Sequence, residues 1–193
     1  MTRWGRVIGA GAAGVAIFGG TIAQAGAAED GRDSIPESVF DAVRVGIAQH
    51  DANVFGHRKE SGGDVALELR FHPLTGEFWD SIWSPRPHFG VNLSTGGDTN
   101  QLYSGLTWTW RFLGPLFASL DLGAAVHDGA LSTNRPDRKE LGARFLFREA
   151  VELGVSVAGH HTFSVRVDHI SNATLADHNE GLNTLGLLYG YRF

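Results

Sequence analysis

The sequence predicts an all-β protein, an eight-stranded antiparallel transmembrane β-barrel that follows an N-terminal signal peptide. Three observations lead to this prediction. An apolar N-terminal run follows two arginines, later segments alternate between apolar and polar residues, and the last segment alternates large apolar and aromatic residues up to Phe193. Alternation with a period of two is the pattern of a strand whose two faces meet different surroundings.

Residues 1–25 have the features of a secretory signal peptide. Two arginines lie among the first six residues, and an uncharged apolar stretch then ends at two small-x-small sites between Ala23 and Ala27. An N-terminal membrane anchor is the alternative, but glycines interrupt the run and no stop-transfer pattern follows it. We therefore expect cleavage near residue 25 and a barrel domain over residues 26–193.

The composition excludes several classes of function. Loss of the two N-terminal arginines leaves 14 of the 16 basic residues against 21 acidic ones, a net charge of −7, so nucleic-acid binding is not expected. The chain has no cysteine, which rules out a disulfide scaffold and a cysteine-based metal site or nucleophile. After the signal peptide no apolar stretch is long enough for a membrane-spanning helix.

Eight segments carry the alternation, and an even number is typical of bacterial outer-membrane barrels. The sixth leaves two alternatives open, two pieces or one bulged strand, because Glu149 falls on its apolar face. The expected strands are 41–50, 64–72, 86–94, 101–112, 115–125, 139–157, 161–171 and 183–193.

The contents of the two faces indicate which one meets lipid. A barrel in lipid has an apolar outer band and a polar interior, whereas a soluble barrel is filled by bulky apolar residues. Here one face carries Leu, Val, Phe and Trp, and the other carries Arg, Asp, Thr, Ser and Gly. The last strand, with Tyr189, Tyr191 and Phe193 on one face, resembles the C-terminal signal for insertion into the bacterial outer membrane. A soluble periplasmic ligand-binding barrel is the alternative.

If both termini lie on the periplasmic side, the connections between strands divide into inner (periplasmic) turns and outer loops. Leu113-Gly114 and Gly159-His160 are expected to be tight inner turns. The inner segment 73–85 is longer and carries Trp79 and Trp83, which are typical of the membrane interface. The expected outer loops are 51–63, 126–138 and 172–182.

A possible catalytic group lies near the C-terminus. Val165 and Val167 set the lipid-facing parity of strand 161–171, and this parity continues to His169 and Ser171, two positions apart on one face. Asn183 has the outward parity of the neighbouring last strand. A serine, a histidine and an orienting side chain can form a nucleophile, its base and the group that fixes the base. The alternative is that His169 and Ser171 only mark the end of the apolar band.

Two neighbouring patterns have plainer explanations. His160 and His161 are adjacent in sequence and point in opposite directions from a strand, so they do not suggest a metal site. Arg166 and Asp168 face the interior and are expected to pair there.

The segment His169-Ile170-Ser171-Asn172-Ala173, followed by Asn179-Glu180-Gly181-Leu182 and the last strand, resembles the lipid A 3-O-deacylases, the PagL-type outer-membrane enzymes also known as acyloxyacyl hydrolases. The motif covers about residues 166–193, and the signal peptide and barrel pattern extend the resemblance over the chain. It implies hydrolysis of the 3-O-linked acyl ester of lipid A in lipopolysaccharide, without a cofactor or metal. It also implies that His169 is the general base, Ser171 the nucleophile and Asn172 an oxyanion-hole donor.

The sequence departs from this family at the third catalytic position, where the family has Glu and this chain has Asn183. An amide can accept from the imidazole N–H and orient it, but it cannot stabilise the imidazolium by charge, so slower turnover is expected. Glu180 is the nearest carboxylate in sequence and the less favourable replacement because of its loop position. A non-catalytic structural or adhesive outer-membrane barrel is the alternative function, and a homodimer stays open.

Overall fold

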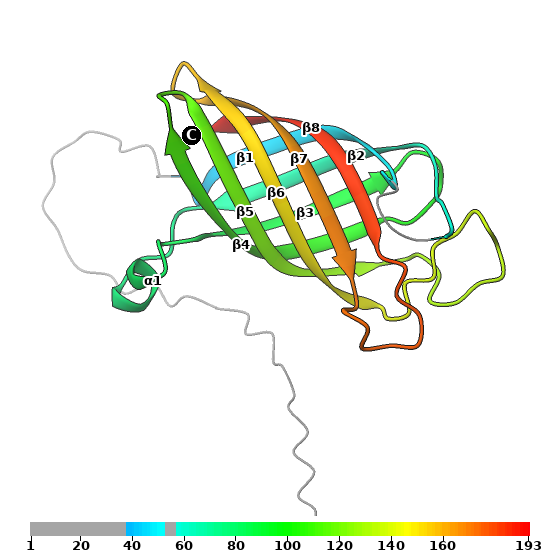
Figure 1. The fold of residues 1–193 in the computed structure, drawn as a ribbon. Helices are drawn as coiled ribbons and strands as arrows, with labels where there is room; N and C mark the ends of the chain where they lie inside the picture. The colour runs from blue at the N-terminus through cyan, green and yellow to red at the C-terminus, as the bar shows by residue number, and fades with distance from the viewer. Residues whose placement is uncertain (1–37, 53–56) are drawn as a thin grey trace, which may run out of the picture. The chain divides into compact units, whose positions relative to one another are not determined.

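Residues 38–52 and 57–193, the part of the chain that the computed structural model describes, contain eight strands that close into an antiparallel barrel (Figure 1). Each strand pairs with its neighbour in sequence, and the first closes the barrel on the last. One short helix, α1 (Glu77–Ser81), lies between the second and third strands. The strands are β1 (Phe40–Gln49), β2 (Gly63–Phe71), β3 (Arg86–Ser94), β4 (Gln101–Phe112), β5 (Leu116–His127), β6 (Phe145–Val157), β7 (His161–Ser171) and β8 (Leu182–Arg192).

The predicted eight-stranded barrel is confirmed, with one correction at the sixth strand. β6 runs without interruption through Glu149 and keeps a continuous register with β5 and β7, so it is neither two pieces nor bulged. The predicted start of this strand at residue 139 was wrong, because Lys139 and Glu140 belong to an outer loop. The expected signal peptide, residues 1–25, lies outside the described residues, and among the residues described no helix is long and apolar enough to cross a membrane.

The two faces of the wall are sorted as the alternation predicts. Large apolar side chains such as Val45, Leu67 and Phe147 are exposed on the outside, whereas most of the side chains buried inside are polar or charged. In the middle of the barrel, four buried arginines meet four buried carboxylates, so the interior charge is balanced. The eight residues are Arg44, Arg70, Arg148, Arg166, Glu68, Asp121, Glu152 and Asp168.

The expected pair of Arg166 with Asp168 was wrong, although both side chains do point inward. Arg166 donates to Glu68 at 2.6 Å, and Asp168 accepts from Arg148. Residues two apart on a strand are about 7 Å apart, so each finds a closer partner on another strand. These bonds fix the positions of β2, β6 and β7 relative to one another.

The two ends of the barrel differ in their connections (Figure 1). At the end that holds the C-terminus, Leu113-Gly114 and Ala158-Gly159 have positive φ at both residues, as a tight hairpin turn requires. The second of these turns, residues 158–160, includes the expected Gly159-His160. The longer loops, including residues 128–144 and 172–181, gather at the opposite end.

A buried polar network joins these longer loops. His50, just beyond β1, contacts Asp64 through Nδ1 at 2.7 Å and Glu60 through Nε2 at 2.8 Å. Glu60 also accepts from the Thr99 hydroxyl at 3.0 Å and from the backbone N–H of Lys139 at 3.1 Å. Three loops far apart in sequence are thereby tied over the end of the barrel.

This network is expected to lose stability as the pH rises. Burial of His50 opposes its protonation, but the hydrogen bonds and charges of Asp64 and Glu60 outweigh burial and raise the pKa of His50 from 6.5 to about 9. Because the folded-state pKa is the higher one, the contribution of charged His50 is complete below pH 6.5 and is lost as the pH rises through about 9. Thermal unfolding in detergent, followed by circular dichroism across this range, measures the effect. His50→Gln should flatten the decline, and an equal decline in both proteins would contradict the assignment.

Candidate active site

The outer end of β7 presents His169 and Ser171 on the outward face. Val165 and Val167 are exposed, whereas the intervening Arg166 and Asp168 are buried, so the alternation continues without a break to the end of the strand. His169 and Ser171 are both partly exposed. The predicted parity of this strand is therefore confirmed.

His169 is bonded to Asn183 on the neighbouring strand. The two residues are direct partners in the β7–β8 register, and His169 Nδ1 lies 2.7 Å from Asn183 Oδ1. Since an amide oxygen only accepts, Nδ1 carries the proton and Nε2 is left unprotonated. Asn183 is only 4% exposed, so the imidazole is held by a buried partner.

The described residues show no hydrogen bond between His169 and Ser171. The two side chains share one face about 7 Å apart along the strand. Bonds between a nucleophile and its base are often long in a free enzyme and shorten only when substrate is bound. The structure thus brings base and orienting group into contact and places the nucleophile beside them.

Gly181 packs against the same imidazole. Its φ is +63°, and a Cβ at this position would lie 2.8 Å from His169 Cε1 and 3.3 Å from the Ile170 carbonyl oxygen. Any larger residue would be strained and would displace the ring. Gly181, which the sequence motif contains, therefore has a steric role in holding His169.

Asn172 directly follows Ser171 at the end of β7 and is buried in the loop. It is 2% exposed, and its amide donates to the backbone carbonyls of Leu141 at 2.9 Å and His178 at 2.5 Å. Its backbone N–H donates to the side-chain oxygen of Asn179 at 2.9 Å. In this arrangement Asn172 holds the loop 172–181 in place, and its donors are occupied.

Glu180 is not a partner of His169. Its carboxylate accepts from the backbone N–H of Glu140 at 2.8 Å and from that of Arg58 at 3.2 Å. It thus ties the last outer loop to the two other loops. Of the two alternatives for the third catalytic position, the structure brings Asn183 to the histidine.

Glu149 is the residue near this site whose relevance the sequence reasoning missed. It lies directly opposite His169 in the β6–β7 register and is exposed on the outward face. The sequence does show Glu149 as a carboxylate on an otherwise apolar strand face. That it lies opposite His169 depends on the register between β6 and β7, which the residue pattern of a single strand does not give.

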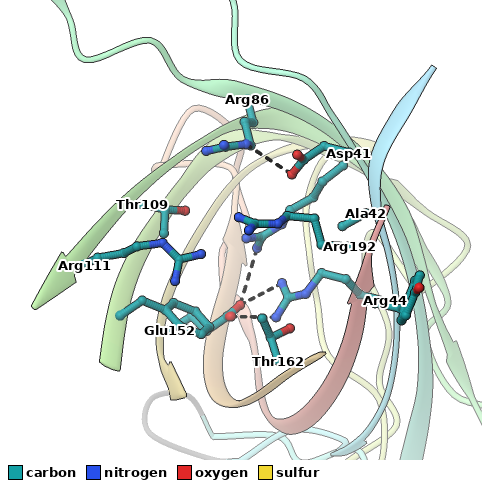
Figure 2. A pocket seen from close by; sticks show the side chains of 12 residues that line it. Asp41, Ala42, Arg44, Arg86, Thr109, Arg111, Glu152, Thr162 and Arg192 are labelled. Atoms are coloured by element: carbon teal, nitrogen blue, oxygen red, sulfur yellow. Dashed lines mark hydrogen bonds and ion pairs between the residues drawn. The ribbon is translucent and has the colours of Figure 1, made fainter. Parts of the chain in front are cut away.

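The cavity of about 130 Å³ in the barrel is a different place. Figure 2 shows Arg86, Arg111 and Arg192 around it, with Arg44 bonded to Glu152 at its base. Its lining includes no serine and no histidine. It therefore does not contain the serine and histidine that the sequence predicts as nucleophile and base.

An apolar groove runs along the outer surface below the candidate site. Its lining comes from β4 to β8 and includes Leu153, Val165 and Leu187. Val165 precedes Ser171 by six residues on β7, roughly 20 Å along the strand. An alkyl chain whose reacting end lies at Ser171 could extend along the outer surface toward this groove.

Comparisons with known proteins place these features in context. Residues 65–192 match the family model described as lipid A 3-O-deacylase (PagL). The crystal structure of the outer membrane enzyme PagL is similar with a TM-score of 0.60 and 20% sequence identity, over 79% of this chain and 99% of that chain. The N-terminal β-barrel domain of Pseudomonas aeruginosa OprF is similar with a TM-score of 0.51 and 10% identity, over 80% and 98%. At these identities the structures support the fold alone, and a comparison with curated protein sequences finds no match.

Proposed function

This chain belongs to the lipid A 3-O-deacylase (PagL) family, and on that premise we propose that Ser171, His169 and Asn183 carry out its reaction. The protein is an outer-membrane hydrolase whose substrate is lipid A. The observation that carries the proposal is the 2.7 Å contact between His169 Nδ1 and Asn183 Oδ1, beside Ser171 on the lipid-facing side of the barrel.

The reaction follows from the protonation state of His169. Its Nε2 takes the proton of Ser171 as the serine oxygen attacks the carbonyl carbon of the acyl ester at position 3 of lipid A. The tetrahedral intermediate collapses, the sugar oxygen leaves with that proton, and the acyl chain stays on Ser171. Water, activated by His169, then hydrolyses this acyl-enzyme and releases the fatty acid.

Asn172 is the proposed oxyanion donor. Since its amide is bonded to the carbonyls of Leu141 and His178, this role requires one of these bonds to be exchanged for the oxyanion when substrate binds. A donor that bonds the developing negative charge lowers the barrier to attack.

The location of the site suits a substrate within the membrane. Ser171 ends a strand that runs toward the outer leaflet, and the apolar groove lies deeper along the same outer surface. An acyl chain that descends from the headgroup can then lie against the exposed side chains of Val167 and Leu185, in the direction of the groove, while its ester lies at Ser171. Lipid A reaches the site by lateral diffusion. The proposed catalytic side chains all come from one chain, so a homodimer would not be required.

Mass spectrometry of lipid A tests the activity directly. The full protein, refolded in detergent, is incubated with lipid A that carries a 3-O-linked hydroxyacyl chain. The expected product has lost one such chain, and the released fatty acid is detected. Unchanged lipid A, with a folded barrel shown by its gel mobility before and after heating, would overturn the proposal.

Replacing Asn183 and Glu180 one at a time tests which of them orients His169. Asn183→Ala removes the acceptor that fixes the His169 tautomer, and we expect kcat to fall by roughly 10²–10⁴-fold. Glu180→Gln keeps the oxygen for one of the two loop bonds and should retain activity within about 5-fold. Initial rates of fatty-acid release measure both. A larger loss in Glu180→Gln than in Asn183→Ala would assign the third role to the loop carboxylate instead.

A further inference from the structure

Glu149 is exceptional on the outer face of the barrel. Within the eight described strands it is the one acidic residue exposed on the outward face, because Asp41, at the bulge in β1, lines the cavity inside the barrel and pairs with Arg86 at 3.3 Å. The outward neighbours of Glu149 on β6, Phe147 and Val151, are exposed apolar residues. A carboxylate among lipid-facing side chains is costly, and such residues are usually retained for function.

Its position relates it directly to the proposed base. Glu149, His169 and Asn183 form one row across β6, β7 and β8, because His169 is the direct register partner of both others. Cβ atoms of direct cross-strand partners are about 4.5–5.5 Å apart, and a glutamate side chain is long enough to bring its carboxylate beside the imidazole. The described residues show no ion pair between them, and Glu149 is exposed.

The other groups around His169 supply no such charge. On the β8 side Asn183 and Gly181 are uncharged. Asp168 and Arg148 lie on the inner side of the wall and pair with each other. Among the described residues packed around the outward face of His169, Glu149 is therefore the carboxylate available to it.

We infer that Glu149 is a positioning residue of the deacylase, whose carboxylate stabilises the imidazolium that forms at His169 when Ser171 gives up its proton. The inference rests on the proposed function. It divides between two residues what one acid does in other triads: Asn183 fixes the tautomer, and Glu149 supplies the negative charge from the opposite strand. A charge supplied by Glu149 also explains how the amide of Asn183 can occupy the third catalytic position.

Glu149→Gln in the full protein tests this inference. The change keeps size and hydrogen-bonding capacity but removes the charge, so kcat should fall by roughly 10-fold or more with KM changed less than about 2-fold. The acid limb of the pH profile should move to lower pH by about one unit, because loss of a nearby carboxylate makes protonated His169 less stable. A purely structural role would not move that limb.

Two further variants complete the design. Glu149→Asp keeps the charge and should retain more activity than Glu149→Gln. Asn183→Glu, added to Glu149→Gln, returns a carboxylate from the β8 side and should restore activity. If Glu149→Gln keeps its activity within about 2-fold and its acid limb is unmoved, while Ser171→Ala is inactive, this inference fails and the proposed function stands. Full activity of Ser171→Ala would instead overturn the proposed function itself.

Discussion

Ser171→Ala is expected to reduce the release of fatty acid from lipid A by at least about 10³-fold. Without its hydroxyl the site has a base but no nucleophile, so no acyl-enzyme can form. Residual hydrolysis by a water molecule that His169 activates would set the remaining rate. Since Ser171 is partly exposed at the end of a strand and no described residue bonds its hydroxyl, the change should not affect folding.

The barrel offers a matched control for this variant. Ser104 on β4 is also exposed on the outward face, and its hydroxyl donates to the His88 carbonyl at 2.9 Å. Ser104→Ala should retain activity within about 2-fold. Mass spectrometry of lipid A and of the intact protein under single-turnover conditions measures both variants. An acyl adduct that persists on the Ser171→Ala protein would place the nucleophile elsewhere.

The fold and the outward position of the candidate site could be predicted because strand parity is a local property. Residues two apart share a face whatever the partner strand is, so Val165 and Val167 were enough to place His169 and Ser171. The neighbourhood of His169 and Asn183 followed from the order of the strands, since consecutive strands of an antiparallel barrel are neighbours. These features need no information from distant parts of the chain.

The remaining features depend on contacts between distant segments. The amide of Asn172 is taken up by the Leu141 carbonyl, 31 residues away in sequence, and the acceptor exists only because residues 139–144 form a loop instead of the start of β6. The partners of Arg166 and Asp168 come from across the interior. The relation of Glu149 to His169 requires the β6–β7 register. Parity alone determines none of these.

Replacement of Glu68 should cause the largest loss of stability. Glu68 is fully buried, and its carboxylate contacts Arg44 at 3.0 Å, Arg70 at 2.8 Å and Arg166 at 2.6 Å. Glu68→Gln leaves four arginines with three carboxylates inside the barrel, and removal of one partner of a buried ion pair typically costs about 3–5 kcal/mol. Because three guanidinium groups share this carboxylate, we expect a cost at or above that range.

Urea unfolding in lipid vesicles, followed by tryptophan fluorescence, measures the free energy of unfolding. Glu77→Gln on the exposed helix α1 is the control and should change it by less than about 0.5 kcal/mol. In the double variant Glu68→Gln with Arg166→Met the interior charges balance again, so it should be more stable than Glu68→Gln alone. A single variant with nearly unchanged stability would mean that water already screens the interior charges. Since Arg166 lies on β7, three residues before His169, a folded Glu68→Gln barrel should also lose activity as the strand that carries the proposed base becomes less well fixed.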